Sequence, residues 1–286
     1  ANGMPSVSSV DFTIQPTHEA TLPITDLTFR RGYGSFDFLY VIDGVPMFID
    51  DHLARFHASS RLLGLGPIPS QEQLKAHAHD LIDANGGGTF GLQLFLTAGD
   101  PLDGFTPQDA RFIALTVPAA TPSPDAFESG YRLITHQHQR DLPEAKTTNY
   151  FTAVRLAPKM REMDANDVLY HDGERVLEAT RCSFFLVGED GTYVTAGRDI
   201  LPGVTRLNTL RALRHAGLPV DERDVALNEV GRASEAFVTS TTKGVMPVLA
   251  IDGEAIGDGR PGPRTREAHA LLKAHRAEWA RAYQRP

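Results

Sequence analysis

The segment DVLYHDGERVLEATRCSFFLVGEDGTYVTA (Asp167–Ala196) decides the fold class that we expect. It contains two Asp-Gly pairs, each flanked by runs of alternating residues, and this pattern predicts two consecutive β-hairpins. The same pattern predicts hairpins at Ser35–Asp50 and Gly244–Gly259. Strands grouped into hairpins, rather than alternating strictly with helices, argue against a Rossmann-type sheet.

The rest of the chain is expected to supply single strands and amphipathic helices. Apolar patterning predicts strands at 89–98, 111–118, 131–137 and 235–241, and helices at 50–66, 70–86, 149–166, 205–217 and 265–283. The stretch Pro118–Gly130 has three prolines and little periodicity, which predicts an interdomain linker at 120–129. We therefore predict an α+β protein with a small N-terminal α/β domain (1–119) and a larger, hairpin-rich domain (130–286).

Composition and charge limit the partners and the location. The chain has 286 residues, and its net charge of −8 argues against a nucleic-acid partner. No apolar run approaches the roughly 20 residues that a membrane helix needs, so no membrane partner is expected. The single cysteine, Cys182, cannot form an internal disulfide, which suits a reducing compartment. We expect a cytoplasmic protein.

One lysine is a candidate for chemistry. The stretch RDLPEAKTTNY (Arg140–Tyr150) holds Lys146, one of only five lysines in a chain with 23 arginines. A lysine amine can lose its proton near neutral pH and attack a carbonyl, which an arginine cannot do. A lysine on a loop is more often a solvated surface residue, so the stretch taken alone leaves both interpretations open.

Two loops have the composition of anion-binding sites. A Pro-Gly turn leads into Val204 and Thr205 at a predicted helix start, where backbone N–H groups and a hydroxyl suit a phosphate. Simple N-capping by Thr205 is the alternative. The stretch FVTSTTKG (Phe237–Gly244) is a second phosphate loop or an ordinary polar turn. His136 and His138 share a strand face but lack further ligands at suitable spacing, so we expect no metal site.

Five segments together resemble a known family. They are RRGYGSFDFLY with FIDDHLARFHASSRLLGL, LPEAKTTNY, VLEATRCSFFLV, ILPGVTRLNTLRAL and EAFVTSTTKGVMPV, which together cover about residues 25–250. Their order and spacing are similar to those of the class IV (fold-type IV) aminotransferases, which depend on pyridoxal 5′-phosphate (PLP). The resemblance implies a two-domain fold in which the larger domain is a pseudo-barrel that carries the PLP lysine.

The resemblance also implies the roles of individual residues. Lys146 would bind PLP covalently and move the proton during transamination. Glu178, in VLEAT, would pair with the pyridine nitrogen and keep the ring an electron sink. The remaining cofactor ligands implied are Arg55, Tyr150, Val204, Thr205 and Thr241, of which all but Tyr150 would bind the phosphate.

Details of three segments are similar to those of D-amino acid transaminases: RRGYGSFD, ITHQHQRDLPEAKT and TRCSFF. The similarity implies that Arg31 and Arg181 bind the substrate carboxylate, Arg31 from the second subunit of a homodimer. Thr242 is a third expected substrate ligand. Gln93 and Ala98 stand where the subgroup has arginines. One carboxylate-binding charge is therefore missing, which disfavours dicarboxylates such as D-glutamate.

The expected function is that of a PLP-dependent transaminase with small-molecule substrates. It would move the amino group of a D-amino acid to a 2-oxo acid such as 2-oxoglutarate or pyruvate by a ping-pong mechanism. Alternatives within the same chemistry are a branched-chain L-amino acid aminotransferase, an (R)-amine transaminase and an aminodeoxychorismate lyase. From a different class, a PLP-free binding protein could keep this fold.

Overall fold

The structure is a computed structural model that describes residues 4–120 and 122–286. The chain forms two compact units, and each is described by itself. The first comprises Ala1–Ala120, Ala145–Tyr150 and Trp279–Pro286, and the second comprises Thr121–Glu144 and Phe151–Glu278. Within the described residues, no helix is long and apolar enough to cross a membrane.

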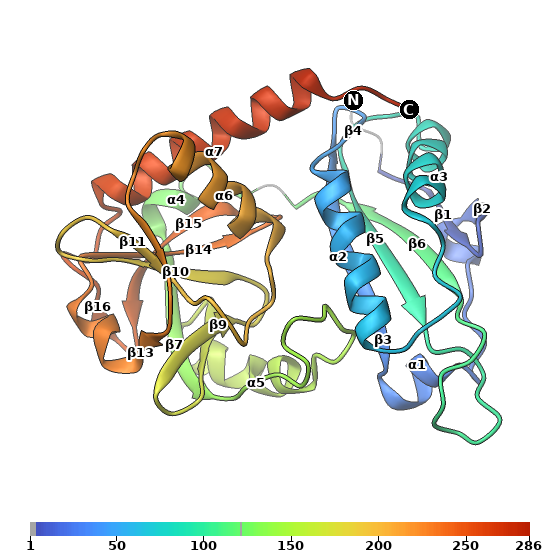
Figure 1. The fold of residues 1–286 in the computed structure, drawn as a ribbon, viewed down its shortest axis with the longest axis horizontal. Helices are drawn as coiled ribbons and strands as arrows, with labels where there is room; N and C mark the ends of the chain where they lie inside the picture. Colours follow the sequence, from blue (N-terminus) through green and yellow to red (C-terminus); the bar gives the residue numbers. More distant parts are fainter. Residues whose placement is uncertain (1–3, 121) are drawn as a thin grey trace. The chain divides into compact units, whose positions relative to one another are not determined.

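The first unit is built on a six-stranded antiparallel sheet, with strand order β2-β1-β6-β5-β3-β4 (Figure 1). Its strands are β1 (Val7–Val10), β2 (Thr13–Pro16), β3 (Gly34–Ile42), β4 (Val45–Pro46), β5 (Phe90–Thr97) and β6 (Phe112–Pro118). Its helices are α1 (Leu27–Arg31), α2 (Ile49–Leu62) and α3 (Gln71–Ala84). The predicted hairpin is formed by β3 and β4, and both turn residues, Asp43 and Gly44, have positive φ.

Alternation along β3 decides which of its side chains meet α2. Leu39 and Val41 are fully buried in one core with Leu53 and Phe56 of α2. Since side chains two residues apart share a face of a strand, Asp37 lies on this same buried face. A charged residue at that position needs partners inside the unit.

The segment Ala145–Tyr150 belongs to the first unit because its backbone pairs with the start of β3. Phe36 N donates to Lys146 O at 3.1 Å, and Thr148 N donates to Gly34 O at 2.9 Å. Strand β4 pairs only with the far end of β3, which leaves room for this segment. The expected boundaries place Lys146 in the larger domain (130–286). The structure differs because Lys146 pairs with a strand more than 100 residues earlier, and such long-range pairing leaves no pattern in the local sequence.

The second unit contains a ten-stranded mixed sheet with the order β12-β11-β10-β14-β15-β7-β8-β9-β13, and β16 pairs with β15. The strands are β7 (Tyr131–Gln137), β8 (Asp167–His171), β9 (Arg175–Ala179), β10 (Ser183–Val187), β11 (Tyr193–Thr195), β12 (Val220–Glu222), β13 (Val225–Ala226), β14 (Glu235–Ser240), β15 (Gly244–Ile251) and β16 (Glu254–Ala255). The helices are α4 (Ala126–Ser129), α5 (Phe151–Glu162), α6 (Val204–His215) and α7 (Pro263–Ala282).

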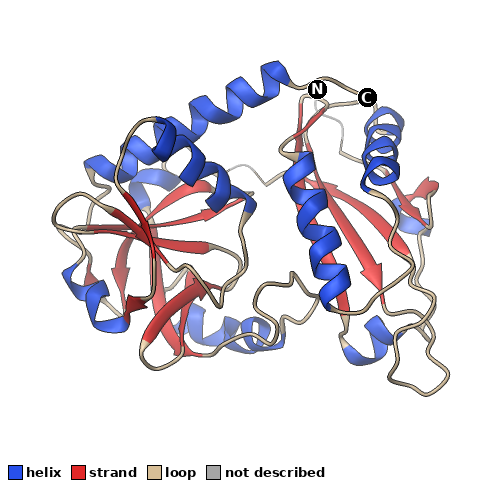
Figure 2. Ribbon diagram, viewed as in Figure 1, coloured by secondary structure: helices blue, strands red, loops and turns tan. Residues whose placement is uncertain are grey.

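This sheet curls into the expected pseudo-barrel. Four strands separate β9 from β10 in the sheet order, yet a turn of three residues joins them, closed by the Ala179 N to Cys182 O bond of 2.9 Å. Only a curled sheet can bring β9 and β10 close enough for so short a turn. Phe184 and Leu186 pack among residues of the other strands, whereas Phe185 packs against residues of α6 and α7. Helices α6 and α7 lie side by side against the strands of this unit (Figure 2). Both faces of β10 are therefore buried.

All predicted hairpins, single strands and helices are present, but several short elements were missed. The hairpin of β1 and β2 turns through Asp11 and Phe12, which have positive φ without a glycine to signal the turn. Helices α1 and α4 are too short for an apolar period to appear. Helix α4 lies inside the expected linker at 120–129, and Thr121 of that linker is outside the described residues.

The C-terminal end of α7 and the tail beyond it are packed into the first unit. The ring of Trp279 lies 5.2 Å from that of Phe48 and 5.0 Å from that of Tyr283. The Tyr283 hydroxyl lies 2.6 Å from Nε2 of the buried His79. Burial and the nearby positive charge of Arg285 lower the pKa of His79 below its ordinary value of 6.5. Burial and Arg285 therefore favour the neutral form of His79.

We expect the substitution Tyr283→Phe to loosen this tail. Losing the hydroxyl should lower the free energy of unfolding by about 2 kcal/mol, because His79 is left buried without its partner. Trp279 is the single tryptophan of the chain and reports the change by its emission. In the unsubstituted protein, the contribution of His79 to stability should be complete above pH 6.5 and decrease as the pH falls below it. The reason is that His79 becomes protonated at a higher pH in the unfolded chain than in the folded protein.

The matched control is Tyr33→Phe, whose hydroxyl donates to the Leu63 carbonyl oxygen at 2.9 Å in the same unit. It should leave the emission of Trp279 unchanged, with no new dependence on pH. Unchanged stability and emission in Tyr283→Phe would show that the hydroxyl does not secure the tail.

Candidate active site

Lys146 is fixed by its backbone on two sides. Besides the bond from Phe36 N, its own N–H donates to Oγ of the fully buried Ser59 on α2, at 2.9 Å. Its amine lies 4.5 Å from the centre of the Phe36 ring, and the Tyr150 ring lies 5.8 Å from that same ring. The first unit therefore brings together two predicted site residues, Lys146 and Tyr150, around Phe36.

Arg55, the third predicted residue in this unit, is held by a buried carboxylate. Its Nε and one terminal nitrogen donate to the two oxygens of Asp37, each at 2.8 Å. Nδ1 of His52 lies 2.7 Å from Asp37 Oδ1. Burial alone would raise the pKa of Asp37, but Arg55 and His52 hold it far below its usual range. Burial lowers the pKa of His52, against the opposing pull of Asp37.

Arg31 has different neighbours. It ends α1, is exposed, and its guanidinium lies 5.4 Å from the centre of the Phe105 ring. Phe29, Leu102 and Phe105 are large apolar side chains around this region that remain more than half exposed. Arg31 thus lies beside an exposed apolar surface.

In the second unit, Glu178 is a buried carboxylate with fixed orientation. Oε1 accepts from Arg140 Nε at 3.3 Å and from Arg140 Nη2 at 3.1 Å. Oε2 accepts from the backbone N–H of Leu201 at 3.1 Å. Since an ionised carboxylate accepts hydrogen bonds and an arginine only donates, this arrangement stabilises the charged form of Glu178.

The predicted Pro-Gly turn and helix start at α6 are present, but Thr205 is not the N-cap. The N-cap is Gly203, without a side-chain hydrogen bond, so Val204 and Thr205 are the first two helical residues. Their N–H groups point out of the helix end, where the dipole favours an anion. A Cβ on Gly203 would lie 2.6 Å from Ser183 Oγ, so a larger residue here would have to displace the Ser183 side chain. The N-capping interpretation of Thr205 is therefore wrong.

The second predicted loop lies at the same end of this sheet. Ser183 pairs with Thr239 across β10 and β14, and the β14–β15 turn follows at Ser240. Within this turn the hydroxyls of Ser240 and Thr242 are 3.4 Å apart, with Thr241 between them in sequence. Ser183 therefore connects the start of α6 with the hydroxyl-rich turn. Thr239 Oγ1 is buried and has no hydrogen-bond partner among the described residues.

Arg181 and the two strand histidines are also in this unit. Arg181 is exposed in the β9–β10 turn, two residues before Ser183. The ring of His138 packs 4.9 Å from that of Tyr170. Among residues 4–120 and 122–286, no group of three or more His, Cys, Asp and Glu side chains could hold a metal ion.

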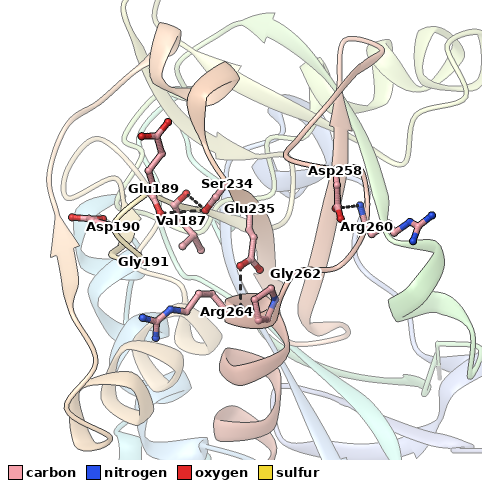
Figure 3. A pocket seen from close by; sticks show the side chains of 12 residues that line it. Val187, Glu189, Asp190, Gly191, Ser234, Glu235, Asp258, Arg260, Gly262 and Arg264 are labelled. Atoms are coloured by element: carbon pink, nitrogen blue, oxygen red, sulfur yellow. Dashed lines mark hydrogen bonds between the residues drawn. The ribbon is translucent and has the colours of Figure 1, made fainter.

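A separate cavity of about 470 Å³ lies at the other end of the same strands (Figure 3). The β10–β11 turn, the start of β14 and the start of α7 line it. Its Glu235 is buried and accepts from Arg264 N at 3.0 Å and Thr265 N at 2.8 Å, which caps α7. None of the predicted site residues lines this cavity. It lies a strand's length away from Ser183 and Ser240.

The sequence analysis missed several residues that contact the predicted site residues. Asp37 could have been found, because strand alternation places it on the buried face of β3, and His52 and Arg55 are three apart on one face of a helix. Arg140 stands six residues before Lys146 without any pattern that links it to Glu178. Ser183 and Gly203 come together only through the fold.

Similarity to known proteins identifies the family. Residues 34–251 match the family Amino-transferase class IV. The D-alanine aminotransferase of Bacillus licheniformis is 31% identical over 264 residues, which cover 89% of this chain and 92% of that protein. The branched-chain-amino-acid aminotransferase-like protein 1 of Arabidopsis thaliana is 25% identical over 91% of this chain and 49% of its own. The chain belongs to the class IV aminotransferases, as the sequence motifs predicted.

Solved structures share the fold. The T.th. branched-chain amino acid aminotransferase with pyridoxamine 5′-phosphate superimposes with a TM-score of 0.86 at 21% identity, covering 96% of this chain and 95% of that one. A putative 4-amino-4-deoxychorismate lyase from Legionella pneumophila gives 0.81 at 23% identity, covering 90% and 96%. The two-unit α+β architecture is thus that of fold type IV.

Class IV aminotransferases use PLP, and the residues present fit this cofactor. At one end of its sheet the second unit offers a helix start at Gly203 without a side-chain cap. It also offers the Thr239 hydroxyl, which has no hydrogen-bond partner among the described residues, and both suit a phosphate. Glu178 offers a fixed carboxylate for a pyridine nitrogen. The first unit offers a buried arginine and a lysine amine.

Proposed function

We propose that the chain is a D-amino acid transaminase, which moves an amino group from a D-amino acid to a 2-oxo acid such as pyruvate or 2-oxoglutarate by a ping-pong mechanism. The observation that carries this proposal is the similarity to a D-alanine aminotransferase over 92% of that protein's length. The three segments containing Arg31, Lys146 and Arg181 support it further. A location in the cytoplasm remains a prediction from composition.

In this proposal Lys146 attaches the cofactor and moves a proton at the α-carbon of the substrate. Bound PLP supplies the electron sink for that step. Glu178 keeps the ring nitrogen protonated, and Arg140 and Leu201 N hold its carboxylate ready. Tyr150 contacts the cofactor beside Phe36. The phosphate ligands are Arg55, Val204, Thr205 and Thr241.

Substrate binding in this proposal depends on Arg31, Arg181 and Thr242, which take the substrate carboxylate. Arg31 acts in the site of a second subunit of a homodimer. The exposed apolar side chains beside it, Phe105 among them, support a subunit interface there. Gln93 of β5 is neutral, so we expect a monocarboxylate donor to be preferred over a dicarboxylate.

Titration of the PLP-loaded protein with single amino donors tests the proposal. D-alanine should bleach the visible absorption of bound PLP, D-glutamate should do so more slowly, and L-leucine and (R)-1-phenylethylamine should have little effect. Bleaching by L-leucine alone would establish a branched-chain aminotransferase instead. Bleaching by the amine alone would establish an (R)-amine transaminase. No response to any donor would favour the lyase.

A further inference from the structure

We infer that Asp37 is a positioning residue for cofactor binding, which acts by fixing the guanidinium of Arg55. The inference rests on the proposed role of Arg55 as a phosphate ligand. Asp37 is not in the set of residues that the sequence motifs assign to the cofactor. Asp37 holds the guanidinium of Arg55 in one orientation, in which it would bind the phosphate.

The geometry of the ion pair gives this orientation. Asp37 is completely buried, and Arg55 is about 9% exposed. Both carboxylate oxygens are engaged, one by Nε and the other by a terminal nitrogen of Arg55, at 2.8 Å each. Such a two-point contact fixes the plane of the guanidinium as well as its position, which a single hydrogen bond does not do.

The Asp37 carboxylate is itself held by two groups besides Arg55. Asp37 Oδ1 lies 2.7 Å from His52 Nδ1 and accepts from Phe38 N at 2.9 Å. Because ionised Asp37 can only accept, the Nδ1 of His52 must carry the hydrogen. His52 and Arg55 are three residues apart on α2, so both reach the same carboxylate on β3. The charged groups that act on His52 are Asp37, Arg55 and Lys146.

Two effects of Asp37 on a bound phosphate oppose each other. As a negative charge, it weakens the attraction of Arg55 for an anion. As a clamp, it holds the long side chain of Arg55 in one rotamer before the anion binds, so binding costs less conformational entropy. We expect the clamp to dominate, because a buried arginine that loses its carboxylate turns toward solvent to recover hydration.

The substitution Asp37→Asn separates these effects, because they predict opposite signs. The clamp predicts that D37N weakens the affinity of the apo-protein for PLP about 10-fold, in the range of coupling between directly paired residues. The charge effect alone predicts tighter binding. The affinity is measured by the visible absorption of PLP added to apo-protein, and thermal unfolding of the apo-protein is followed in parallel.

A double-mutant cycle with Arg55→Gln distinguishes positioning from a general structural role. If Asp37 acts through Arg55, D37N should change PLP affinity less than about twofold in the R55Q background. Equal losses in both backgrounds would overturn the inference, as would unchanged or tighter binding by D37N alone. An R55Q protein with full PLP affinity would instead refute the proposed phosphate role of Arg55.

The substitution Asp37→Glu covers the case in which D37N does not fold. It keeps the charge and moves the carboxylate by one methylene, so the ion pair can form but Arg55 is displaced. We expect weaker PLP affinity than in the unsubstituted protein with folding preserved. Full affinity in D37E would show that the exact placement of Arg55 does not matter and would overturn the inference.

Discussion

Lys146→Ala should abolish the visible absorption of covalently bound PLP and slow transamination by about 10⁴-fold or more, which corresponds to about 5–6 kcal/mol in activation free energy. The reason is that the substitution removes the amine proposed to attach PLP, on a residue positioned by Phe36 N, by its own bond to Ser59 and by the nearby ring of Phe36. Single-turnover absorbance with D-alanine measures the loss.

Two further variants make this prediction specific. Lys146→Arg keeps the positive charge but not an amine that can lose its proton, so it should be as inactive as the alanine variant. Lys273→Ala removes an exposed lysine of α7 and should change neither spectrum nor rate. A small primary amine added to Lys146→Ala should restore part of the rate. A persistent absorption band in Lys146→Ala would rule out the assignment.

The fold was predictable where local chemistry decides it. The Asp43-Gly44 turn requires positive φ at both residues, and an Asp-Gly pair in the sequence predicts such a turn. The turn at Asp11 and Phe12 has the same requirement without a glycine, and the hairpin that it closes was missed. Pairing between segments distant in sequence, such as Thr147 with Ser35, leaves no local pattern at all.

The candidate site was predictable only as a set of residue types in motifs. The motifs suggested that Glu178 and Arg55 carry charge for the cofactor, but they did not reveal the residues that hold them. Arg140 lies 38 residues from Glu178, and Asp37 lies 18 residues from Arg55. These partners follow from burial, since a charged group removed from water needs a counter-charge. Which counter-charge is used depends on the fold.

Glu178→Gln should leave PLP bound but slow the half-reaction with D-alanine about 100-fold, or about 3 kcal/mol. A neutral amide cannot keep the ring nitrogen protonated, and its NH₂ group would face the donors Arg140 and Leu201 N unless it turned outward. Affinity for PLP should fall much less than the rate, because the proposed phosphate ligands are other residues. Rapid-mixing absorbance separates the two quantities.

Glu235→Gln is the matched control, because Glu235 is also a buried carboxylate of the second unit, with 8% exposure like Glu178. It accepts from two backbone N–H groups of α7, and Figure 3 shows the bond from Arg264. Glu235 begins β14, whereas the hydroxyl-rich turn follows the other end of this strand. We expect Glu235→Gln to lower the free energy of unfolding by about 1 kcal/mol and to leave the half-reaction unchanged. An equal rate loss in both variants would mean that Glu178 contributes through stability alone. A loss confined to Glu178→Gln would tie the carboxylate that Arg140 holds to the chemistry of the cofactor ring.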